Sequence, residues 1–195
     1  MSKTAIILDT EFTTWVGAMA AGWVEDWQHR EIVQISAVKI NTETLEILEK
    51  FDQLTKPRIN PELSDFFTEL TGITQAEVDR DGLSFIAGYD GFKAFVDGDT
   101  VHCYGWDGRV IAENLEMNDA ADRIPEITFS NLQPYFGSKG VDASVINSGK
   151  LASHFGVDIE IREHNAMDDV YSIHAALKHL KAQGHNLPFK YKEAA

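Results

Sequence analysis

Cysteine and basic residues are scarce in this sequence, and long apolar runs are missing from it. A single cysteine, Cys103, among 195 residues excludes an intrachain disulfide and is typical of a reducing compartment, so we expect a cytoplasmic protein. No apolar run approaches the roughly 20 residues that a membrane-spanning helix needs. The apolar stretch 5–8 is too short for the core of a signal peptide, and acids follow it directly. The sequence therefore predicts no association with a membrane.

Bases are also few relative to acids. The chain has 17 Lys and Arg residues against 31 Asp and Glu residues, which gives a formal net charge of −14. Proteins that bind duplex nucleic acid without sequence preference depend on a basic surface. Two interpretations remain open: the charge serves solubility and says little about the site, or the substrate is a short or free end that bound metals and a few local contacts hold.

The pattern of apolar residues predicts an α/β fold in a single domain. No repeat, low-complexity tract or flexible linker divides residues 1–195, so we expect a core over about 4–182 and a short C-terminal tail over 184–195. About five strands should form a mixed sheet flanked by helices. The strands are expected at 5–12, 31–40, 45–55, 100–106 and 126–130. The helices are expected at 61–71, directly after Thr74, and at 84–97, 108–118, 131–136, 148–155 and 165–183, the first with Asn60 as its cap and Pro61 in its first turn.

Two acids lie at the end of the first predicted strand. Asp9 and Glu11 follow the apolar residues 5–8 and are two positions apart, so their side chains point to the same face of the sheet. Two neighbouring carboxylates raise each other's pKa unless a positive charge lies between them. A divalent metal ion is the usual solution, since hard cations prefer oxygen ligands. The alternative for this pair alone is a cap and a solvated acid at a strand end.

Asp107 has a comparable position. It follows the predicted strand 100–106 and immediately precedes a predicted helix. Taken alone, it is better explained as the N-cap of that helix. Taken with the other acids, it predicts a further ligand at the same edge of the sheet.

The last long helix adds a third group of polar residues. Its apolar face is defined by positions such as Val170 and Ile173, and Asp169 lies on that buried side. Asp168 is rotated by about 100° toward the polar face, so Asp169 is the predicted ligand and Asp168 is not. His164 precedes the first turn, where it can lie over the site, although a histidine in that position is more often a cap or a surface residue. Buried without partners, four acids would cost stability, and convergence on metal ions accounts for all of them.

These residues resemble the motifs of a known family. Asp9-Thr10-Glu11, Asp107 and His164-x-Ala166-x-x-Asp169 are similar, in order and spacing, to the three motifs of the DEDDh branch of the DnaQ-like 3′→5′ exonucleases. The resemblance covers about residues 4–182. The segments 60–67 and 70–74 (NPELSDFF and LTGIT) resemble the subgroup that contains the RNAi-enhancer and histone-mRNA 3′ exonucleases.

The resemblance implies a ribonuclease-H-like fold and two Mg²⁺ or Mn²⁺ ions as cofactors. Phosphodiester hydrolysis would then release nucleoside monophosphates from the ends of single-stranded RNA or DNA, or from short oligonucleotides, and no obligate protein partner is implied. The metal ligands carried over are Asp9, Glu11, Asp107 and Asp169, and His164 is the general base. The expected contacts with substrate are the backbone around Thr10 and Phe12, the wall formed by Leu70, Thr71 and Ile73, and Trp106.

Several alternatives stay open. The sister branch carries a tyrosine in place of the histidine, and Tyr171 is two residues past Asp169 on the wrong side for that role. Tryptophans in the long connection 13–30 and at position 106 either stack on unpaired bases or anchor irregular chain to the core. The C-terminal lysines form a substrate track or merely balance a helix end; these are Lys178, Lys181, Lys190 and Lys192. The rival function is a catalytically inactive module of the same fold that binds a nucleic-acid end or a protein.

Overall fold

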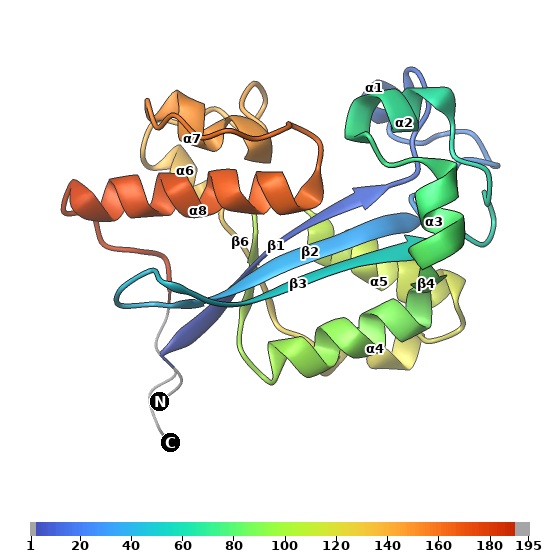
Figure 1. The fold of residues 1–195 in the computed structure, drawn as a ribbon, viewed down its shortest axis with the longest axis horizontal. Coiled ribbons are helices and arrows are strands. Elements are labelled where there is room, and N and C mark those ends of the chain that lie inside the picture. Colours follow the sequence, from blue (N-terminus) through green and yellow to red (C-terminus); the bar gives the residue numbers. More distant parts are fainter. Residues whose placement is uncertain (1–2, 190–195) are drawn as a thin grey trace.

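The computed structural model describes residues 3–189, and one mixed sheet occupies its centre (Figure 1). The six strands are arranged in the order β4-β3-β2-β1-β5-β6. Strands β1, β2 and β3 are antiparallel neighbours, whereas β5 pairs in parallel with β1, β6 with β5, and β4 with β3. Their bounds are Thr4–Phe12 (β1), Ile32–Asn41 (β2), Ile47–Lys56 (β3), Leu83–Ser84 (β4), Val101–Cys103 (β5) and Phe129–Asn131 (β6). This confirms the predicted α/β mixed sheet flanked by helices, with the two-residue β4 as an additional strand.

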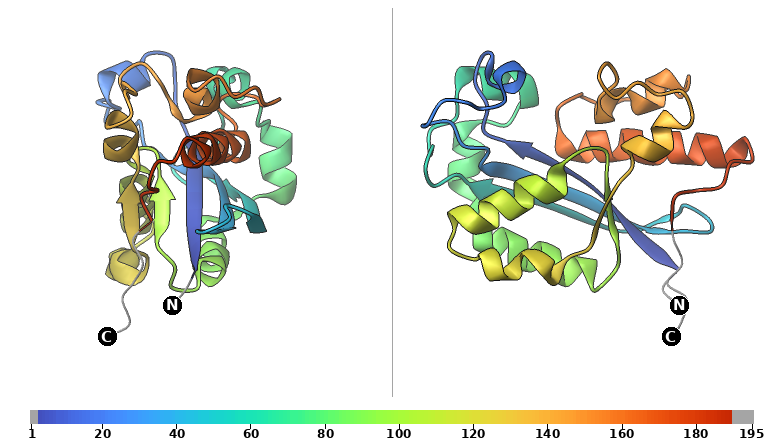
Figure 2. Two further views of the ribbon diagram at one scale, coloured as in Figure 1. Left: turned by 90° about the vertical axis from the view of Figure 1, so that its left-hand side faces the viewer. Right: turned by 180° about the vertical axis from the view of Figure 1, so that it is seen from behind.

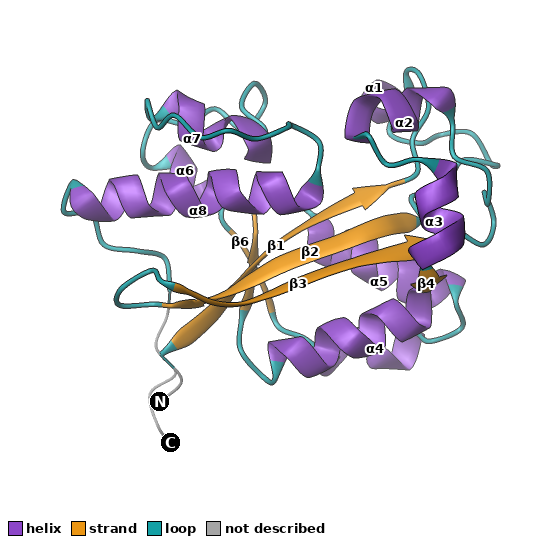
Figure 3. Ribbon diagram, viewed as in Figure 1, coloured by secondary structure: helices purple, strands orange, loops and turns teal. Residues whose placement is uncertain are grey.

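Helices cover both faces of the sheet (Figures 2 and 3). The helices α6, α7 and α8 lie on one face, α4 and α5 lie on the other, and α1, α2 and α3 gather near the end where β1 finishes (Figure 1). The α-helices are Ala18–Ala21 (α1), Asp65–Thr71 (α2), Gln75–Asp81 (α3), Phe85–Val96 (α4), Asp107–Met117 (α5), Gln133–Gly137 (α6), Leu151–His154 (α7) and Ala166–Ala182 (α8). Two 3₁₀ helices, η1 and η2, span Ala121–Glu126 and Ser148–Lys150.

The alternation of side chains along β1 divides the core into two parts. Ala5 and Ile7 pack with the apolar face of α8, while Ile6 and Leu8 pack with α4 and α5 on the opposite face. Because strand side chains alternate, Asp9 and Glu11 continue the row that begins with Ala5 and Ile7. The strand therefore aims both acids at the face that α8 covers.

The start of helix α2 differs from the sequence prediction. The helix begins at Asp65 with Ser64 as its N-cap, whose hydroxyl accepts a hydrogen bond from the Phe67 N–H. The predicted start at Asn60-Pro61 is wrong. The backbone N–H groups of residues 58–60 donate to the buried Glu31 carboxylate, and the Leu63 N–H donates to Gln75 Oε1, so these bonds hold the segment in a loop. The predicted end is confirmed, since Gly72 closes the helix with φ of 80°.

Other boundaries shift by a few residues. Strand β5 ends at Cys103 rather than at 106, because the chain bends at Gly105, whose φ is 149°. The segment 148–155 is split into the 3₁₀ helix η2 and the short α7. Within the described range 3–189, no helix is long and apolar enough to cross a membrane. The expected tail over 184–195, with Lys190 and Lys192, lies partly outside the described residues.

Candidate active site

Three of the predicted ligands meet at the end of β1. Carboxylate oxygens of Asp9, Glu11 and Asp169 all lie within 4.8 Å of one another, so a single cation could contact all three groups. Asp9 and Asp169 are buried, with 7% and 3% of their surface exposed, and Glu11 is half-buried. Strand β1 supplies the first two, and the first turn of α8 supplies the third. The structure thus brings together residues that are up to 160 positions apart in the sequence.

The carboxylates in this cluster perturb one another strongly. Burial, followed by the charges of Asp169 and Asp107, raises the pKa of Glu11 to about 8. Burial also raises the pKa of Asp169 to about 7. For Asp9, burial and three neighbouring acids raise the pKa well above its ordinary value. Without a compensating positive charge the cluster retains protons at neutral pH, and a divalent cation would remove that penalty.

Asp107 lies beside this cluster and is held by its own partner. It is the first residue of α5, with Trp106 as the N-cap, so its predicted alternative role as cap is not the one it has. Its Oδ1 accepts a hydrogen bond of 2.8 Å from the Thr10 hydroxyl, and 9% of its surface is exposed. Burial raises the pKa of Asp107, and its charge in turn raises the pKa of Asp9 and Glu11. Asp107 therefore belongs electrostatically to the same site.

Asp169 is oriented by the turn that precedes α7. The Ser148 hydroxyl donates a hydrogen bond of 2.9 Å to Asp169 Oδ2. The other oxygen, Oδ1, is buried and has no hydrogen-bond partner among the described residues. Gly149 lies against that oxygen, because a Cβ atom at this position would be 2.6 Å from it. Ser148 and Gly149 were not predicted as site residues, because Asn-Ser-Gly is an ordinary pattern at the start of a helix.

His164 lies at the corner that leads into α8. Its backbone has a left-handed φ of 62°, uncommon for a residue with a side chain, and the next residue, Asn165, caps the helix by accepting from the Asp168 N–H. The His164 backbone lies close enough to Asp169 to act against the rise in the pKa of that carboxylate. Partial burial lowers the pKa of the imidazole; the charge of Glu163 opposes this shift and the charge of Lys150 adds to it. The ring is therefore neutral near pH 7, the form that accepts a proton.

Gln34 links the sheet to this corner and was also missed by the sequence reasoning. It faces Glu11 across the β1–β2 pair, and its Oε1 accepts a hydrogen bond from the backbone N–H of Ala166. Its Nε2 donates to Asp52 Oδ1 at 2.9 Å. A buried glutamine in a strand is a signal that could have been noticed, because buried polar groups need partners.

The predicted substrate contacts are arranged around the end of β1 with different exposures. Thr10 is buried, and its hydroxyl donates a hydrogen bond to Asp107. The Thr71 hydroxyl is likewise engaged, since it donates to the Phe67 carbonyl and accepts from the Ile73 N–H. Ile73 is buried, whereas Leu70 and Phe12 are half-buried. Trp106 is 68% exposed next to Asp107, so its ring is accessible. Their roles in binding stay predictions.

The connection 13–30 forms an aromatic loop with the short α1 inside it. Trp23 packs on Phe12, with ring centroids 5.5 Å apart, and the Arg30 guanidinium lies over both rings. Trp15 and Trp27 make an edge contact at 4.8 Å. Trp23 also donates its indole N–H to the Thr13 carbonyl. These contacts anchor the loop to the core, which is one of the two roles considered for its tryptophans. Trp27 nevertheless keeps 52% of its surface exposed.

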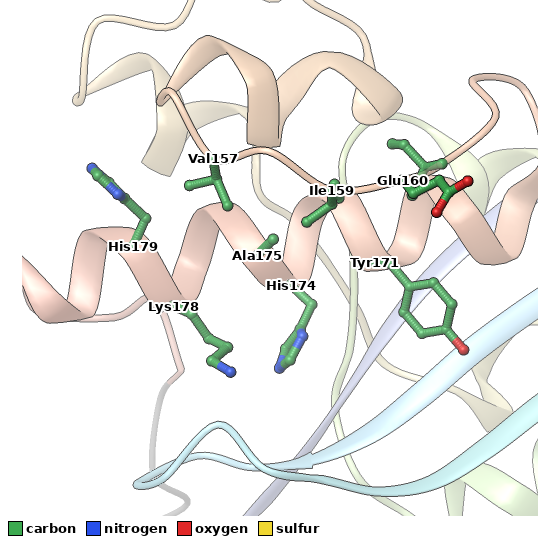
Figure 4. A pocket seen from close by; sticks show the side chains of 9 residues that line it. Val157, Ile159, Glu160, Tyr171, His174, Ala175, Lys178 and His179 are labelled. Atoms are coloured by element: carbon green, nitrogen blue, oxygen red, sulfur yellow. The ribbon is translucent and has the colours of Figure 1, made fainter.

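A separate apolar groove of about 590 Å³ lies along α8 (Figure 4). Val157 and Ile159 face the helix from the segment above it, and Tyr171, His174 and Lys178 project from the helix. Tyr171 lines this groove, and its hydroxyl accepts a hydrogen bond from Lys50 Nζ at 2.7 Å. The expectation that Tyr171 does not take the place of the histidine is consistent with this placement.

The fold and the site together define a class. The mixed sheet with this strand order has the ribonuclease-H-like fold, and here it carries buried acids at the end of its first strand and at the start of a helix laid across it. The chain belongs to the Exonuclease (RNase_T) family, whose sequence profile matches residues 6–177. Membership implies divalent metal cofactors, and the carboxylate cluster fits them.

Curated relatives share short stretches of sequence with this chain. Human 3'-5' exoribonuclease 1 is 54% identical over 50 residues, which is 26% of this chain and 14% of that protein. Human ERI1 exoribonuclease 2 is 39% identical over 78 residues, 38% of this chain and 10% of that protein. The matches therefore span a small part of the length of these relatives.

Solved structures agree over nearly the whole chain. The nuclease domain of 3'hExo, a DEDDh family member bound to rAMP, superposes with a TM-score of 0.81 at 24% identity, covering 98% of both chains. A 3'-exonuclease solved with a histone mRNA stem-loop superposes with a TM-score of 0.78 at 25% identity, covering 93% of this chain and 83% of that one. The family and the fold predicted from the sequence are confirmed.

Proposed function

We propose that this chain is a metal-dependent 3′→5′ exonuclease that releases nucleoside monophosphates from single-stranded RNA or DNA ends or short oligonucleotides. The observation that carries the proposal is the convergence of Asp9, Glu11 and Asp169 within 4.8 Å, with Asp107 held beside them. Four acids gathered from the end of strand β1 and the first turns of helices α5 and α8 raise one another's pKa, which costs stability without a cation. A catalytic metal site explains why the chain would retain that cost.

The four acids would hold two divalent ions, Mg²⁺ or Mn²⁺. When bound, such ions activate a water molecule for attack on the phosphorus atom and stabilise the leaving 3′-oxygen. The chain's own contribution is to fix the ligands: β1 fixes Asp9 and Glu11, the Thr10 hydroxyl fixes Asp107, and the Ser148 hydroxyl restrains Asp169. Preorganised ligands are what such a reaction requires, because its catalysis depends on positioning and on stabilising developing charge.

His164 would take the proton of the attacking water. Its lowered pKa keeps the imidazole neutral near pH 7, and its half-buried position at the N-terminal corner of α8 places it near Asp169. The left-handed backbone at His164 holds the residue at the corner instead of inside the helix. A neutral imidazole on the residue at the corner that leads to Asp169 supports the role of general base.

The substrate would be held by apolar and aromatic side chains more than by the basic side chains of Lys and Arg. Trp106 offers an exposed ring beside Asp107, and stacking of an unpaired base on such a ring contributes roughly 1–3 kcal/mol. The backbone at Thr10 and Phe12, and the wall of Leu70, Thr71 and Ile73, complete the proposed subsite. Relatives of this chain are named exoribonucleases, while exonuclease I of E. coli, a further match in fold, was solved with a dA16 oligonucleotide. RNA and DNA therefore belong in the same test.

Paired variants test the proposal. Asp9→Asn and Asp169→Asn preserve side-chain size while removing charge, and each should abolish release of nucleoside monophosphate from a single-stranded RNA or DNA oligonucleotide with Mn²⁺. Asp158→Asn, on an exposed aspartate away from the cluster, is the matched control and should keep full activity. Thermal melting establishes that each variant is folded. Activity retained in both cluster variants would overturn the mechanism, and an inactive wild type that still binds oligonucleotide would favour the inactive binding module.

A further inference from the structure

The turn 147–150 contacts the carboxylate cluster although it carries no acid. Ser148 places its hydroxyl between two of the acids: it donates to Asp169 Oδ2 at 2.9 Å and also lies within hydrogen-bonding range of Asp9. A hydroxyl has one proton to donate, so its single bond is directed at one oxygen at a time. The bond restrains rotation of the Asp169 carboxylate about its last torsion, which is otherwise soft.

The opposite oxygen of Asp169 is left without a protein partner. Oδ1 is buried and makes no hydrogen bond within residues 3–189, although buried carboxylate oxygens almost always have a partner. Gly149 borders this oxygen, and an added Cβ would lie 2.6 Å from Oδ1 and 3.1 Å from Glu163 Cγ. Since Gly149 has no left-handed φ, its backbone does not explain the glycine, and the space beside Oδ1 does.

The turn is itself tied to the helix that presents Asp169. The Ser172 hydroxyl, fully buried one turn further along α8, donates to the Gly149 carbonyl at 2.9 Å and accepts from the Ala152 N–H. The Asn147 side chain closes the turn by accepting from the Lys150 N–H. Helix α8 therefore holds both the ligand and the turn that orients it, so their relative position is fixed.

We propose that Ser148 and Gly149 are positioning residues for Asp169: the Ser148 hydroxyl fixes Oδ2, and the missing side chain at Gly149 leaves Oδ1 free to bind a divalent cation. This inference rests on the proposed metal-dependent function. Partners of metal-binding carboxylates orient the ligand, and losing such a partner typically weakens metal binding by about 10- to 100-fold.

The test measures Mn²⁺ binding by calorimetry on the full chain, alongside thermal melting in chelator to follow the fold. Ser148→Ala should weaken Mn²⁺ binding by about 10-fold or more. Ser148→Thr, which keeps the hydroxyl, should restore most of the affinity. Ser144→Ala is the matched control, because the Ser144 hydroxyl donates to Asp142 in an exposed turn, and it should bind Mn²⁺ as the wild type does. Cleavage by Ser148→Ala should recover as the Mn²⁺ concentration rises, which a general folding defect would not allow.

A second substitution tests the steric half of the proposal. Gly149→Ala should abolish saturable Mn²⁺ binding, whereas Gly137→Ala, where an added Cβ meets nothing within 4 Å, should leave it unchanged. Wild-type affinity in both Ser148→Ala and Gly149→Ala would overturn the inference while leaving the exonuclease proposal intact. A wild type that neither binds Mn²⁺ nor cleaves would instead remove the proposed function on which the inference rests.

Discussion

Glu11→Gln removes one carboxylate from the cluster, and we expect it to stabilise the metal-free protein at alkaline pH. Burial and the neighbouring acids Asp169 and Asp107 raise the pKa of Glu11 from 4.5 to about 8 in the folded chain. Between those values the folded state binds a proton that the unfolded state has lost. The free energy of unfolding therefore falls as pH rises through this window, and the effect is absent below about pH 4.5, where both states are protonated.

The magnitude follows from linkage. One proton difference changes the free energy of unfolding by about 1.4 kcal/mol for each pH unit. Over pH 5 to 8 the Glu11 carboxylate alone would cost on the order of 3 kcal/mol, and because the acids of the cluster titrate together their separate effects do not add. The glutamine variant lacks this ionisation, so its stability should decline less steeply over the same range. Mn²⁺ should remove most of the wild-type decline, since a bound cation favours the ionised carboxylates.

Urea unfolding at pH 5, 6, 7 and 8 in the presence of chelator measures these slopes through the midpoint and m-value. Glu46→Gln is the matched control, because it removes one acid from an exposed position near the β2–β3 turn without entering the cluster. The difference between the two variants isolates the cluster from the general repulsion of a chain with net charge −14. Equal pH slopes for wild type, Glu11→Gln and Glu46→Gln would refute the reasoning.

Three further predictions follow from the same contacts. His164→Ala should lower the cleavage rate by roughly 10²- to 10⁴-fold, as loss of a general base does, with Mn²⁺ affinity retained in calorimetry. Trp106→Ala should weaken binding of a single-stranded oligonucleotide by roughly 1–3 kcal/mol, seen as a raised KM with little change in kcat, and an unchanged KM would exclude stacking there. Glu31→Ala should lower the free energy of unfolding by about 3 kcal/mol or more in urea titration. The reason is that the buried Glu31 carboxylate accepts three backbone N–H groups of the 58–60 loop, which would lose their partner.

The long, regularly patterned elements were predictable from sequence. Strand β1 begins with a continuous apolar run, and its two-residue alternation placed Asp9 and Glu11 on one face. Helix α8 carries clear apolar periodicity, which placed Asp169, not Asp168, on the buried side. The Asp168 carboxylate accepts a hydrogen bond from the backbone N–H of Arg162. This contact agrees with the prediction that Asp168 is not a metal ligand. The two-residue repeat of a strand and the 3.6-residue repeat of a helix were enough to assign these side chains to their faces.

Features that depend on contacts distant in sequence were not predictable. Asn60-Pro61 has the local signature of a helix start, but side chains distant in sequence hold this segment in a loop. Glu31 accepts from the backbone of residues 58–60 and Gln75 accepts from the Leu63 N–H, and the helix begins at Asp65. Ser148 became part of the site only because α8 brings Asp169 against it, 21 residues later. A single serine or glycine has no periodic signal, and only the packed fold gives it a role.

The most direct test of the central claim follows a 5′-labelled single-stranded oligonucleotide over time, as RNA and as DNA, with Mn²⁺, with Mg²⁺ and with chelator. We predict a ladder that shortens one nucleotide at a time from the 3′ end with either metal ion and stops with chelator. The more rapidly shortened strand would identify the preferred sugar. A label that stays on full-length oligonucleotide under every condition, or a ladder that persists in chelator, would contradict a metal-dependent 3′→5′ exonuclease.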